Sequence, residues 1–359
     1  PLYDLEPAEP EGWIYGNRQT LADGAAPEEE LLALLGAPSI ASKRWAFEQY
    51  DSIVGSRTVR RPEQADAAVL QLPEADNAIA VSIDGNGRRV ACNPYAGTIE
   101  SVLECAQNLA CVGAEPLGLT NCLNFGNPEK PTGAWQLDRA VSGLADACNA
   151  LGVPVVGGNV SLYNEGPEGP IYPTPVVAMV GELPDPARVA GSAFVDEGDT
   201  IGLIGPFEPN LAGSELAKQR GELKMGLPQP DIENVAAACE IVRNAVRAGK
   251  LSSVHDVSDG GLAVAIAECA IAGSIGCETN IEHLRKRGAQ PTEALFGEGL
   301  GGFLVSGDRA ALEDLGAVLI GTVGGDAISI GAGDRSLSVS LAAAERAWRS
   351  LDAQVETAV

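Results

Sequence analysis

Two segments of this sequence place polar residues directly after a short apolar run. Residues 155–164 read VVGGNVSLYN, and residues 119–128 read LTNCLNFGNP. Because glycine has no Cβ, a backbone that contains a glycine pair can approach a phosphate or a metal-bound oxygen closely. Either segment alone is best interpreted as a strand that ends in a turn, since Asn and Gly are the usual turn residues. The two together predict a backbone site for a phosphorylated ligand.

A third segment, residues 255–262, reads HDVSDGGL and lies between a predicted strand and a predicted helix. Asp259 is expected to cap that helix, whose N-terminus would also attract an anion. The chain has two histidines, His255 and His283, and His255 is its sole plausible imidazole base. A structural role for His255 is the preferred interpretation, and a role as a base is the alternative.

The common nucleotide-binding and hydrolase motifs do not occur. There is no GxxxxGK[ST] loop, no GxGxxG after a strand, no HExxH and no GxSxG. The chain has six lysines, so phosphate binding would rest on backbone amides, on Mg²⁺ held by Asn or Asp, and on arginine.

Composition excludes some classes of function. The chain has 49 acidic and 24 basic residues, for a net charge of −25, whereas a nucleic-acid binder needs an excess of Lys and Arg. Its eight cysteines form no CxxC pair and are expected to be buried thiols of a cytoplasmic protein. No apolar run approaches the roughly 20 residues that span a bilayer, so no membrane association is expected.

Apolar periodicity predicts the elements that position these segments. In chain order they are a helix over 27–35, strands over 65–72 and 78–84, a helix over 98–112, a strand over 117–120, a helix over 134–151, a strand from 154, and a strand over 175–183. The triplet Gly85-Asn86-Gly87 is interpreted as a hairpin turn. This order predicts an α+β layer with the sheet on one side and the helices on the other.

A second unit is expected after residues 184–198, which are rich in Pro, Ala, Gly and acidic residues. It contains predicted strands over 200–204, 252–254, 303–305, 318–323 and 327–330, and helices over 231–248, 262–272 and 341–356. Residues 1–26 are rich in Pro, Glu, Gly and Asp and are expected to form an extended arm or linker.

Longer runs carry a family resemblance. They are NPYAGTIESVLECAQNLACVGAEPLGLTNCLNFGNPEKP (93–131), GLADACNALGVPVVGGNVSLYNE (143–165), PTPVVAMVGEL (173–183) and HDVSDGGLAVAIAECAIAG (255–273). These runs resemble the large subunit of phosphoribosylformylglycinamidine synthase, and more narrowly its C-terminal half. The opening PLYDLEPAEP and the stretch SIASKRWAFEQYDSIVGSRTV (39–59) resemble the joint between the two halves of that family.

The resemblance implies a PurM-like fold, related to aminoimidazole ribonucleotide (AIR) synthetase, with an N-terminal α+β domain and a C-terminal α/β domain. It divides the chain into an arm from a preceding half (1–43), an N-terminal domain (44–185), a C-terminal domain (186–345) and the end of a C-terminal helix (346–359). In this fold the N-terminal sheet pairs with its counterpart in the other half. In isolation the chain would pair with itself as a homodimer.

The resemblance also implies a reaction. Formylglycinamide ribonucleotide is amidated in purine biosynthesis: ATP with Mg²⁺ activates the formyl amide oxygen as an iminophosphate, and ammonia then displaces phosphate. The ammonia comes from a glutaminase subunit, usually with a small bridging subunit. The first half of the large subunit would complete the site.

Four residues match the motifs of that family. By resemblance, Asn121 and Gly158 contact ATP, Asn159 binds Mg²⁺, and Ser161 touches the ribonucleotide. The chemistry fits, since a backbone amide suits phosphate, an oxygen ligand suits a hard cation, and a hydroxyl forms hydrogen bonds. Asn121 stands where the family commonly has the Asp of a TDCLNFGNP motif, so a carboxylate is lost and an oxygen acceptor is kept.

Other family residues are missing. The lysine and the His-Asn-His segment that grip ATP and substrate, and the catalytic histidine, belong to the first half of the family's large subunit. Here Ser82 stands near the place of that lysine, and Glu298-Gly299-Leu300 stands where the first half usually has Glu-Ser-Gln. The resemblance therefore implies no catalytic residue in this chain and an incomplete active site.

Three functional interpretations remain open. The first is the second half of the synthase, contributing to a site that the other half completes. The second is a non-catalytic nucleotide-binding or scaffold domain that forms a homodimer. The third is a free-standing ATP-dependent kinase or synthetase of the same superfamily, which the length of the resemblance disfavours.

Overall fold

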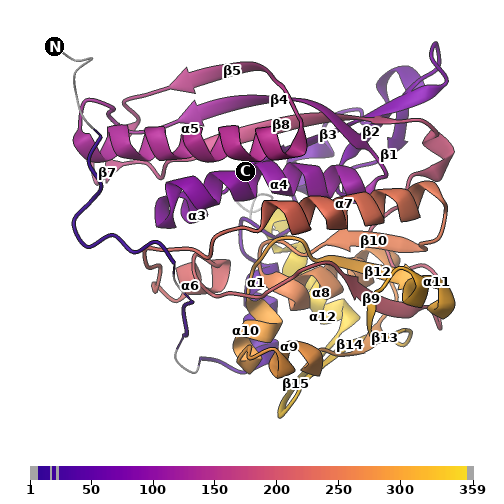
Figure 1. The fold of residues 1–359 in the computed structure, drawn as a ribbon. Coiled ribbons are helices and arrows are strands. Elements are labelled where there is room, and N and C mark those ends of the chain that lie inside the picture. The colour runs from indigo at the N-terminus through magenta and orange to yellow at the C-terminus, as the bar shows by residue number, and fades with distance from the viewer. Residues whose placement is uncertain (1–6, 17, 22–23, 354–359) are drawn as a thin grey trace.

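The structure is a computed structural model that describes residues 7–16, 18–21 and 24–353. The chain forms two domains, each built on one β-sheet, which lie one above the other in Figure 1. Helices α4 (Pro94–Cys111) and α5 (Pro131–Leu151) of the first domain and α7 (Ile232–Arg247) of the second lie between the sheets and contact one another. Within the described ranges, no helix is both long and apolar enough to cross a membrane.

The first domain has a six-stranded sheet in the order β1-β2-β3-β8-β4-β5. Its strands are β1 (Thr58–Arg60), β2 (Ala68–Leu72), β3 (Asn77–Asp84), β4 (Glu115–Asn124), β5 (Val155–Ser161) and β8 (Thr174–Leu183). Strands β4 and β5 are parallel and are joined by α5, whereas the other neighbours are antiparallel. The short strands β6 (Glu165–Gly166) and β7 (Gly169–Pro170) pair separately.

Helices cover one face of this sheet, and α4 is the central one. It begins after Asn93, whose side chain accepts hydrogen bonds from the backbone amides of Tyr95 and Ala96, and Pro94 occupies its first turn. Most α4 side chains are buried, because the helix lies between the sheet and the second domain. Helix α5 ends at Gly152, which adopts a left-handed conformation (φ 66°).

The opposite face of the six-stranded sheet, here called the open face, presents apolar side chains to solvent. Strand pairing puts these residues on one side of the sheet: Leu70, Ile79, Val81, Ile83, Val176, Ala178 and Val180. Ile83 is 68% exposed and Val180 is 37% exposed. An apolar sheet face of this kind is typical of a surface that another protein layer covers.

The second domain has a seven-stranded sheet in the order β10-β12-β9-β13-β11-β14-β15. Its strands are β9 (Thr200–Ile204), β10 (Ser253–Asp256), β11 (Cys277–Asn280), β12 (Phe303–Gly307), β13 (Val318–Val323), β14 (Ala327–Ala332) and β15 (Arg335–Ser340). Its longer helices, besides α7, are α8 (Gly261–Gly273) and α12 (Leu341–Trp348). The shorter helices of the chain are α2 (Arg44–Phe47), η2 (Val54–Ser56), α3 (Gly87–Cys92), η3 (Pro186–Arg188), α6 (Glu215–Gln219), α9 (Glu282–Lys286), α10 (Pro291–Phe296) and α11 (Arg309–Asp314).

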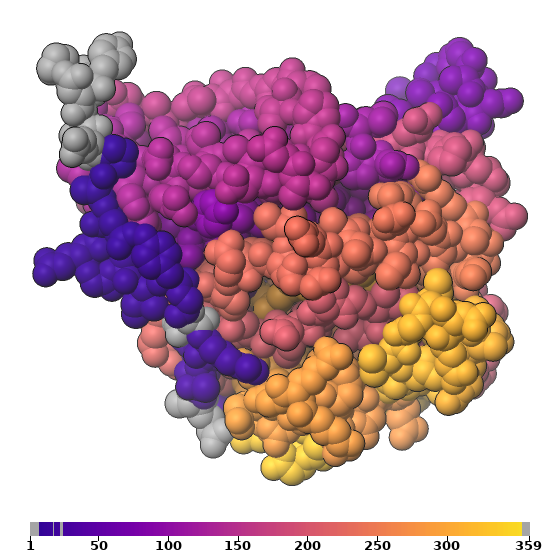
Figure 2. Space-filling model, in the orientation of Figure 1, coloured from indigo at the N-terminus to yellow at the C-terminus, as the bar shows by residue number. Residues whose placement is uncertain are grey.

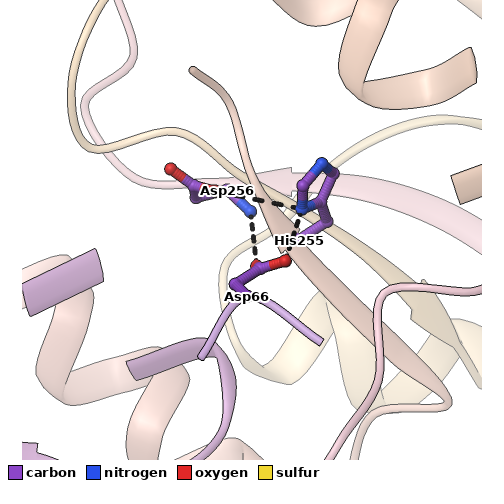
Figure 3. Close-up of side chains that lie close together, drawn as sticks. All are labelled: Asp66, His255 and Asp256. Atoms are coloured by element: carbon purple, nitrogen blue, oxygen red, sulfur yellow. Dashed lines mark hydrogen bonds and ion pairs between the residues drawn. The ribbon is translucent and has the colours of Figure 1, made fainter. Parts of the chain in front are cut away.

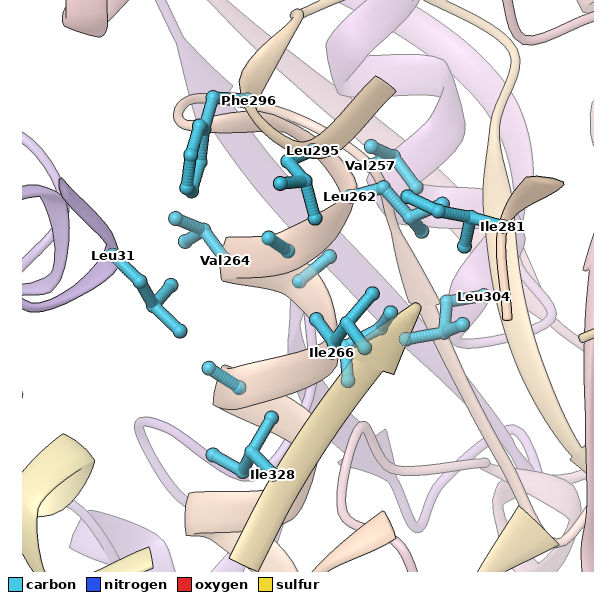
Figure 4. Close-up of a cluster of buried hydrophobic side chains, with 14 of the residues drawn as sticks. Leu31, Val257, Leu262, Val264, Ile266, Ile281, Leu295, Phe296, Leu304 and Ile328 are labelled. Atoms are coloured by element: carbon cyan, nitrogen blue, oxygen red, sulfur yellow. The ribbon is translucent and has the colours of Figure 1, made fainter. Parts of the chain in front are cut away.

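The largest hydrophobic core of the second domain surrounds α8, as Figure 4 shows. Helix α8 is apolar except for Glu268, and its residues from Gly261 to Ala267 are buried. Helix α1 (Pro27–Leu35) joins this core although it precedes the first domain in sequence. Its side chains of Leu31, Leu34 and Leu35 are fully buried there. Segment 27–35 therefore packs as part of the second domain.

The described part of the N-terminal arm runs along the side of both domains (Figure 2). The Trp13 ring packs edge-on against Trp135 of the first domain, with ring centroids 4.6 Å apart. Further along, Arg18 makes a bidentate ion pair of 2.9 and 3.0 Å with the buried Glu293 of the second domain. The arm thus contacts both domains.

The predicted fold class, an α+β domain followed by an α/β domain, is confirmed. One predicted turn is wrong: Gly85-Asn86-Gly87 does not make a hairpin but leads into α3, and the Asn86 side chain caps that helix through the Arg89 amide. Glycine is needed here for close approach, since a Cβ at Gly87 would lie 2.3 Å from Thr174 Oγ1. The C-terminal helix α12 ends at Trp348, a further helical turn spans 350–353, and the rest of the predicted range lies outside the described residues.

Candidate functional site

The four residues expected to bind ligands lie on β4 and β5, at one edge of the six-stranded sheet. In the parallel pairing of these strands, Asn121 lies opposite Gly158, and Cys122 lies opposite Asn159. Because side chains alternate along a strand, Asn121 and Gly158 share one face while Asn159 and Ser161 share the other. The face with Asn159 is the open face, since Cys122 also pairs with Val176 of β8.

On the helix-covered face, the Asn121 side chain packs against Gly158. A Cβ at position 158 would lie 3.0 Å from Asn121 Oδ1, so a larger residue there would displace the amide. On the open face, Asn159 is exposed, and its Nδ2 donates to Cys122 Sγ at 3.4 Å. The Asn164 side chain donates to both the carbonyl oxygen and the hydroxyl of Ser161. The structure therefore brings the four predicted residues close together at the edge of the sheet. Asn121 and Gly158 lie on its helix-covered face, whereas Asn159 and Ser161 lie on its open face.

A cleft of about 660 Å³ lies elsewhere, between the two domains, and none of those four residues lines it. Asp84 at the end of β3 and Glu104 and Asn108 on α4 line it from the first domain. Asp256 at the end of β10 lines it from the second domain. The sequence did not identify these residues as a set, because they come from three elements far apart in the chain.

The carboxyl groups of the cleft are held close enough to perturb one another. Burial, and then the charge of Asp256, raise the pKa of Asp84 to about 8. Burial also raises the pKa of Glu104 well above its usual range, assisted by the charges of Asp256 and Asp84. Burial and the neighbouring Asp66 raise the pKa of Asp256 to about 6. At neutral pH some of these groups therefore retain protons that a bound cation would displace.

Amide side chains complete this oxygen-rich cluster. Asn108 Nδ2 donates to Asp84 Oδ2 at 3.2 Å, and Gln107 Nε2 donates to Asp256 Oδ2 and Glu104 Oε2, each at 3.3 Å. Carboxylate and amide oxygens are the ligands that Mg²⁺ prefers, and they are the donors present here. Asp84, Glu104, Asn108 and Asp256 offer such oxygens to the cleft. Among the described residues, the acidic and imidazole groups whose ligand atoms all lie within 4.8 Å of one another are Asp66, His255 and Asp256.

His255 lies at the side of the cleft and is held by carboxylates on both ring nitrogens. Figure 3 shows the side of the ring that faces Asp66 and Asp256. Its Nδ1 is 2.7 Å from Asp66 Oδ1 and 3.9 Å from Asp256 Oδ1, and its Nε2 is 3.2 Å from Glu268 Oε2. Burial acts to lower the pKa of His255, but the charge and hydrogen bond of Asp66, together with the hydrogen bond of Glu268, raise it well above the ordinary value. An imidazolium that bridges two carboxylates has no free lone pair, which agrees with the preferred structural role and not with a base.

Asp259 does not cap α8, so that prediction is wrong. The cap position is Gly260, in a left-handed conformation (φ 82°) and with no side-chain cap. Asp259 instead pairs with Arg88 of the first domain at 3.0 Å and accepts a hydrogen bond from Asn86 at 2.9 Å. The buried guanidinium of Arg88 attracts the carboxylate more strongly than the helix amides do.

Glu298 joins the two domains at the floor of the cleft. Its side chain is 3% exposed and accepts hydrogen bonds from the backbone amides of Glu215 and Gly260 at 2.6 and 2.9 Å. It also pairs with Arg88 at 3.1 Å and Arg89 at 3.3 Å, both from α3 of the first domain. Ser82, by contrast, is buried on the helix-covered face of β3.

The two domains and their order define a class of protein. A model of the N-terminal domain of AIR synthase related proteins matches residues 64–183, and a model of their C-terminal domain matches residues 196–331. The chain belongs to the AIR synthase related family. The boundary between the two matches falls within the predicted linker, residues 184–198.

Within this family, the chain is homologous to the PurL subunit of phosphoribosylformylglycinamidine synthase. It is 41% identical to that subunit from Moorella thermoacetica over 97% of this chain and 49% of the relative. It is 46% identical to one from a Synechococcus species over 79% of this chain and 39% of the relative. The chain thus spans about half the length of the relatives that it matches.

Solved structures have the same fold. Thermotoga maritima PurL complexed with FGAR superposes with a TM-score of 0.72 at 17% identity, over 89% of this chain and 53% of the other. AaThiL complexed with AMPPCP and TMP superposes with a TM-score of 0.56 at 20% identity, over 76% of this chain and 90% of the other. At these identities the structural likeness concerns the fold.

Proposed function

We propose that this chain is the second half of a phosphoribosylformylglycinamidine synthase large subunit. The observation that carries the proposal is the 41% identity to a PurL subunit over 97% of the chain. The activity would be the ATP-dependent amidation of formylglycinamide ribonucleotide with ammonia from a glutaminase subunit. A small bridging subunit would complete the assembly, and PurLQS from Thermotoga maritima is among the solved structures that share the fold of this chain.

In this proposal the edge formed by β4 and β5 supplies one side of the active site. Asn121 and Gly158 would contact ATP, and Asn159 would hold Mg²⁺ through its exposed amide oxygen. Ser161 would touch the ribonucleotide. The exposure of β5 supports this assignment, because a ligand or a second half can reach every residue from Val155 to Val160.

The first half of the subunit would lie on the open face. Exposed Ile83, Val180 and their apolar neighbours leave a face that a second sheet of the same kind would cover. In isolation a second copy of this chain would take that place and give a homodimer. The same contact would bring the groups of the other half against Asn159 and Ser161.

The chain alone would not catalyse the reaction. Ser82 is buried where the family has its lysine, and His255 is engaged on both ring nitrogens. Burial, and then the charge of Arg287, lower the pKa of His283, which lies on α9 away from both sites. These observations support a catalytic base supplied by the first half.

The acidic cleft supports a second role within the same protein, the binding of a Mg²⁺-associated phosphorylated ligand. Asp84, Glu104, Asn108 and Asp256 would hold the cation, which would supply charge neutralisation to the phosphates. The alternative function, a non-catalytic nucleotide-binding scaffold, would use this cleft alone. The eight free thiols fit a reducing compartment, so we place the proposed function in the cytoplasm.

Calorimetry with ATP and Mg²⁺ tests the metal role of Asn159, in an Asp84→Asn background that weakens the proposed cleft site. Asn159→Ala is expected to weaken the apparent Mg²⁺ affinity of the full-length protein by more than about tenfold. Thr120→Ala, on the neighbouring strand and the same face, is the matched control and should bind as wild type does. An unchanged Mg²⁺ affinity in Asn159→Ala would show that Asn159 is not a metal ligand.

A further inference from the structure

Cys122 differs from the other cysteines of the chain. It is partly exposed, whereas the other seven are buried, and it lies on β4 directly opposite Asn159 on β5. Its thiol is within hydrogen-bonding distance of two amide side chains, Asn159 at 3.4 Å and Asn124 at 3.6 Å. The geometry of these contacts determines whether each amide turns its oxygen or its nitrogen toward the thiol.

The Asn124 amide has a single orientation. Its Nδ2 donates to two backbone carbonyl oxygens, those of Cys122 at 3.1 Å and Thr174 at 3.0 Å. Its Oδ1 is therefore turned to the Cys122 thiol and accepts the S–H hydrogen. A reversed amide would set its NH₂ group against the thiol and lose both hydrogen bonds to the carbonyl oxygens.

The orientation of the Asn124 amide determines, through the Cys122 thiol, the orientation of the Asn159 amide. Because the single thiol hydrogen is committed to Asn124, the sulfur presents only lone pairs to Asn159 and can only accept. Asn159 accordingly donates through Nδ2, and its Oδ1 is turned away from the sulfur. A reversed Asn159 amide would bring an oxygen lone pair against the sulfur lone pairs.

We infer that Cys122 is a positioning residue, which holds the Asn159 amide with its oxygen directed to the ligand side of the open face. The inference rests on the proposed function, in which that oxygen binds Mg²⁺. Groups that orient a metal ligand through a hydrogen bond commonly alter metal affinity about 10- to 100-fold when removed. A thiol is a weak acceptor, so an effect near the lower limit is expected.

Magnesium-dependent ATP binding by the full-length protein provides the test. Cys122→Ala removes the acceptor and is expected to weaken apparent Mg²⁺ affinity about tenfold, without a shift in thermal midpoint that would account for it. Cys122→Ser retains a hydroxyl that can donate to Asn124 and accept from Asn159, and should restore most of the affinity. Thr120→Ala, two residues earlier on the same face, is the control and should leave Mg²⁺ affinity unchanged.

Thiol chemistry gives an independent readout. In the monomeric Val180→Glu variant of the isolated chain, whose open face is uncovered, iodoacetamide should alkylate Cys122 ahead of the seven buried cysteines. Alkylation should weaken Mg²⁺ affinity as Cys122→Ala does.

Two outcomes separate the positioning role of Cys122 from the metal role of Asn159. If Asn159→Ala weakens Mg²⁺ binding but Cys122→Ala does not, the positioning role is refuted while the proposed function stands. If Asn159→Ala leaves Mg²⁺ binding unchanged, the proposed metal role is refuted, and the positioning role with it.

Discussion

Replacement of Asp84 by Asn is expected to stabilise the metal-free protein at neutral pH. Burial and the charge of Asp256 raise the pKa of Asp84 to about 8, from an ordinary value of 3.8. Between about pH 4 and pH 8 the folded state therefore keeps a proton that the unfolded state has released. Because the folded state binds more protons, the free energy of unfolding falls as pH rises, by about 1.4 kcal/mol per pH unit.

The magnitude follows from that slope. Over two pH units, from about pH 5 to pH 7, Asp84 alone should cost the folded state on the order of 2 to 3 kcal/mol. His255 changes stability with the same sign, since its pKa is also raised in the folded state. The difference between wild type and Asp84→Asn removes the share of His255 and reports that of Asp84 together with its coupled neighbours Glu104 and Asp256.

Urea unfolding at several pH values, first with a chelator and then with millimolar Mg²⁺, measures the effect. With the chelator, the stability advantage of Asp84→Asn should grow from about pH 5 to pH 7. With Mg²⁺, wild type should gain more stability than the variant, because the cation binds the ionised cleft. Asp314→Asn, an exposed carboxyl on α11, is the matched control. Parallel pH profiles for wild type and Asp84→Asn, or equal stabilisation of both by Mg²⁺, would refute the reasoning.

Three further predictions concern assembly and stability. The isolated chain should be a dimer by light scattering and inactive with formylglycinamide ribonucleotide, ATP and ammonia, and Val180→Glu on the open face should make it a monomer; a monomeric or active wild type would contradict this. Glu298→Ala should lower the free energy of unfolding by about 3 to 5 kcal/mol in denaturant titrations, because it leaves the buried guanidinium of Arg88 with less compensation; a loss below about 1 kcal/mol would count against the interdomain role. Leu34→Ala in α1 should cost about 2 to 5 kcal/mol, whereas Leu117→Ala, at a half-exposed side chain, should cost far less; equal losses would argue against the packing of α1 in the second core.

The sequence predicted long helices and buried strands well, because their apolar spacing is a local property. The helix predicted over 98–112 begins earlier, at Pro94, since the cap made by Asn93 adds a turn without apolar periodicity. The Gly85-Asn86-Gly87 triplet misled because its glycines serve close approach to β8 and Asn86 serves as a helix cap. Short strands such as β11 and β15 escaped prediction, since only their partners in the sheet define them.

The candidate site likewise has one part that the sequence could predict and one part that it could not. The motif residues on β4 and β5 are neighbours in two short segments, so the sequence and a family resemblance could identify them. The cleft carboxyls Asp84, Glu104 and Asp256 lie at the ends or on the faces of separate elements, and only the packing of α4 against β3 and β10 brings them together. A single sequence carries no signal for that juxtaposition.

The packing of α1 in the second domain has a consequence for synthesis of the chain. Helix α1 contacts α12. Residues 27–35 therefore cannot complete their packing until residues 341–348 have been synthesised. On a ribosome the sheet of the first domain can close once residues up to 183 have emerged, while the leucines of α1 still lack their core. During that interval α1 is a nascent hydrophobic segment that a chaperone would recognise. A truncation before α12 would uncover the side of α1 that packs on α12, while α8 and β15 would still hold the rest of the helix.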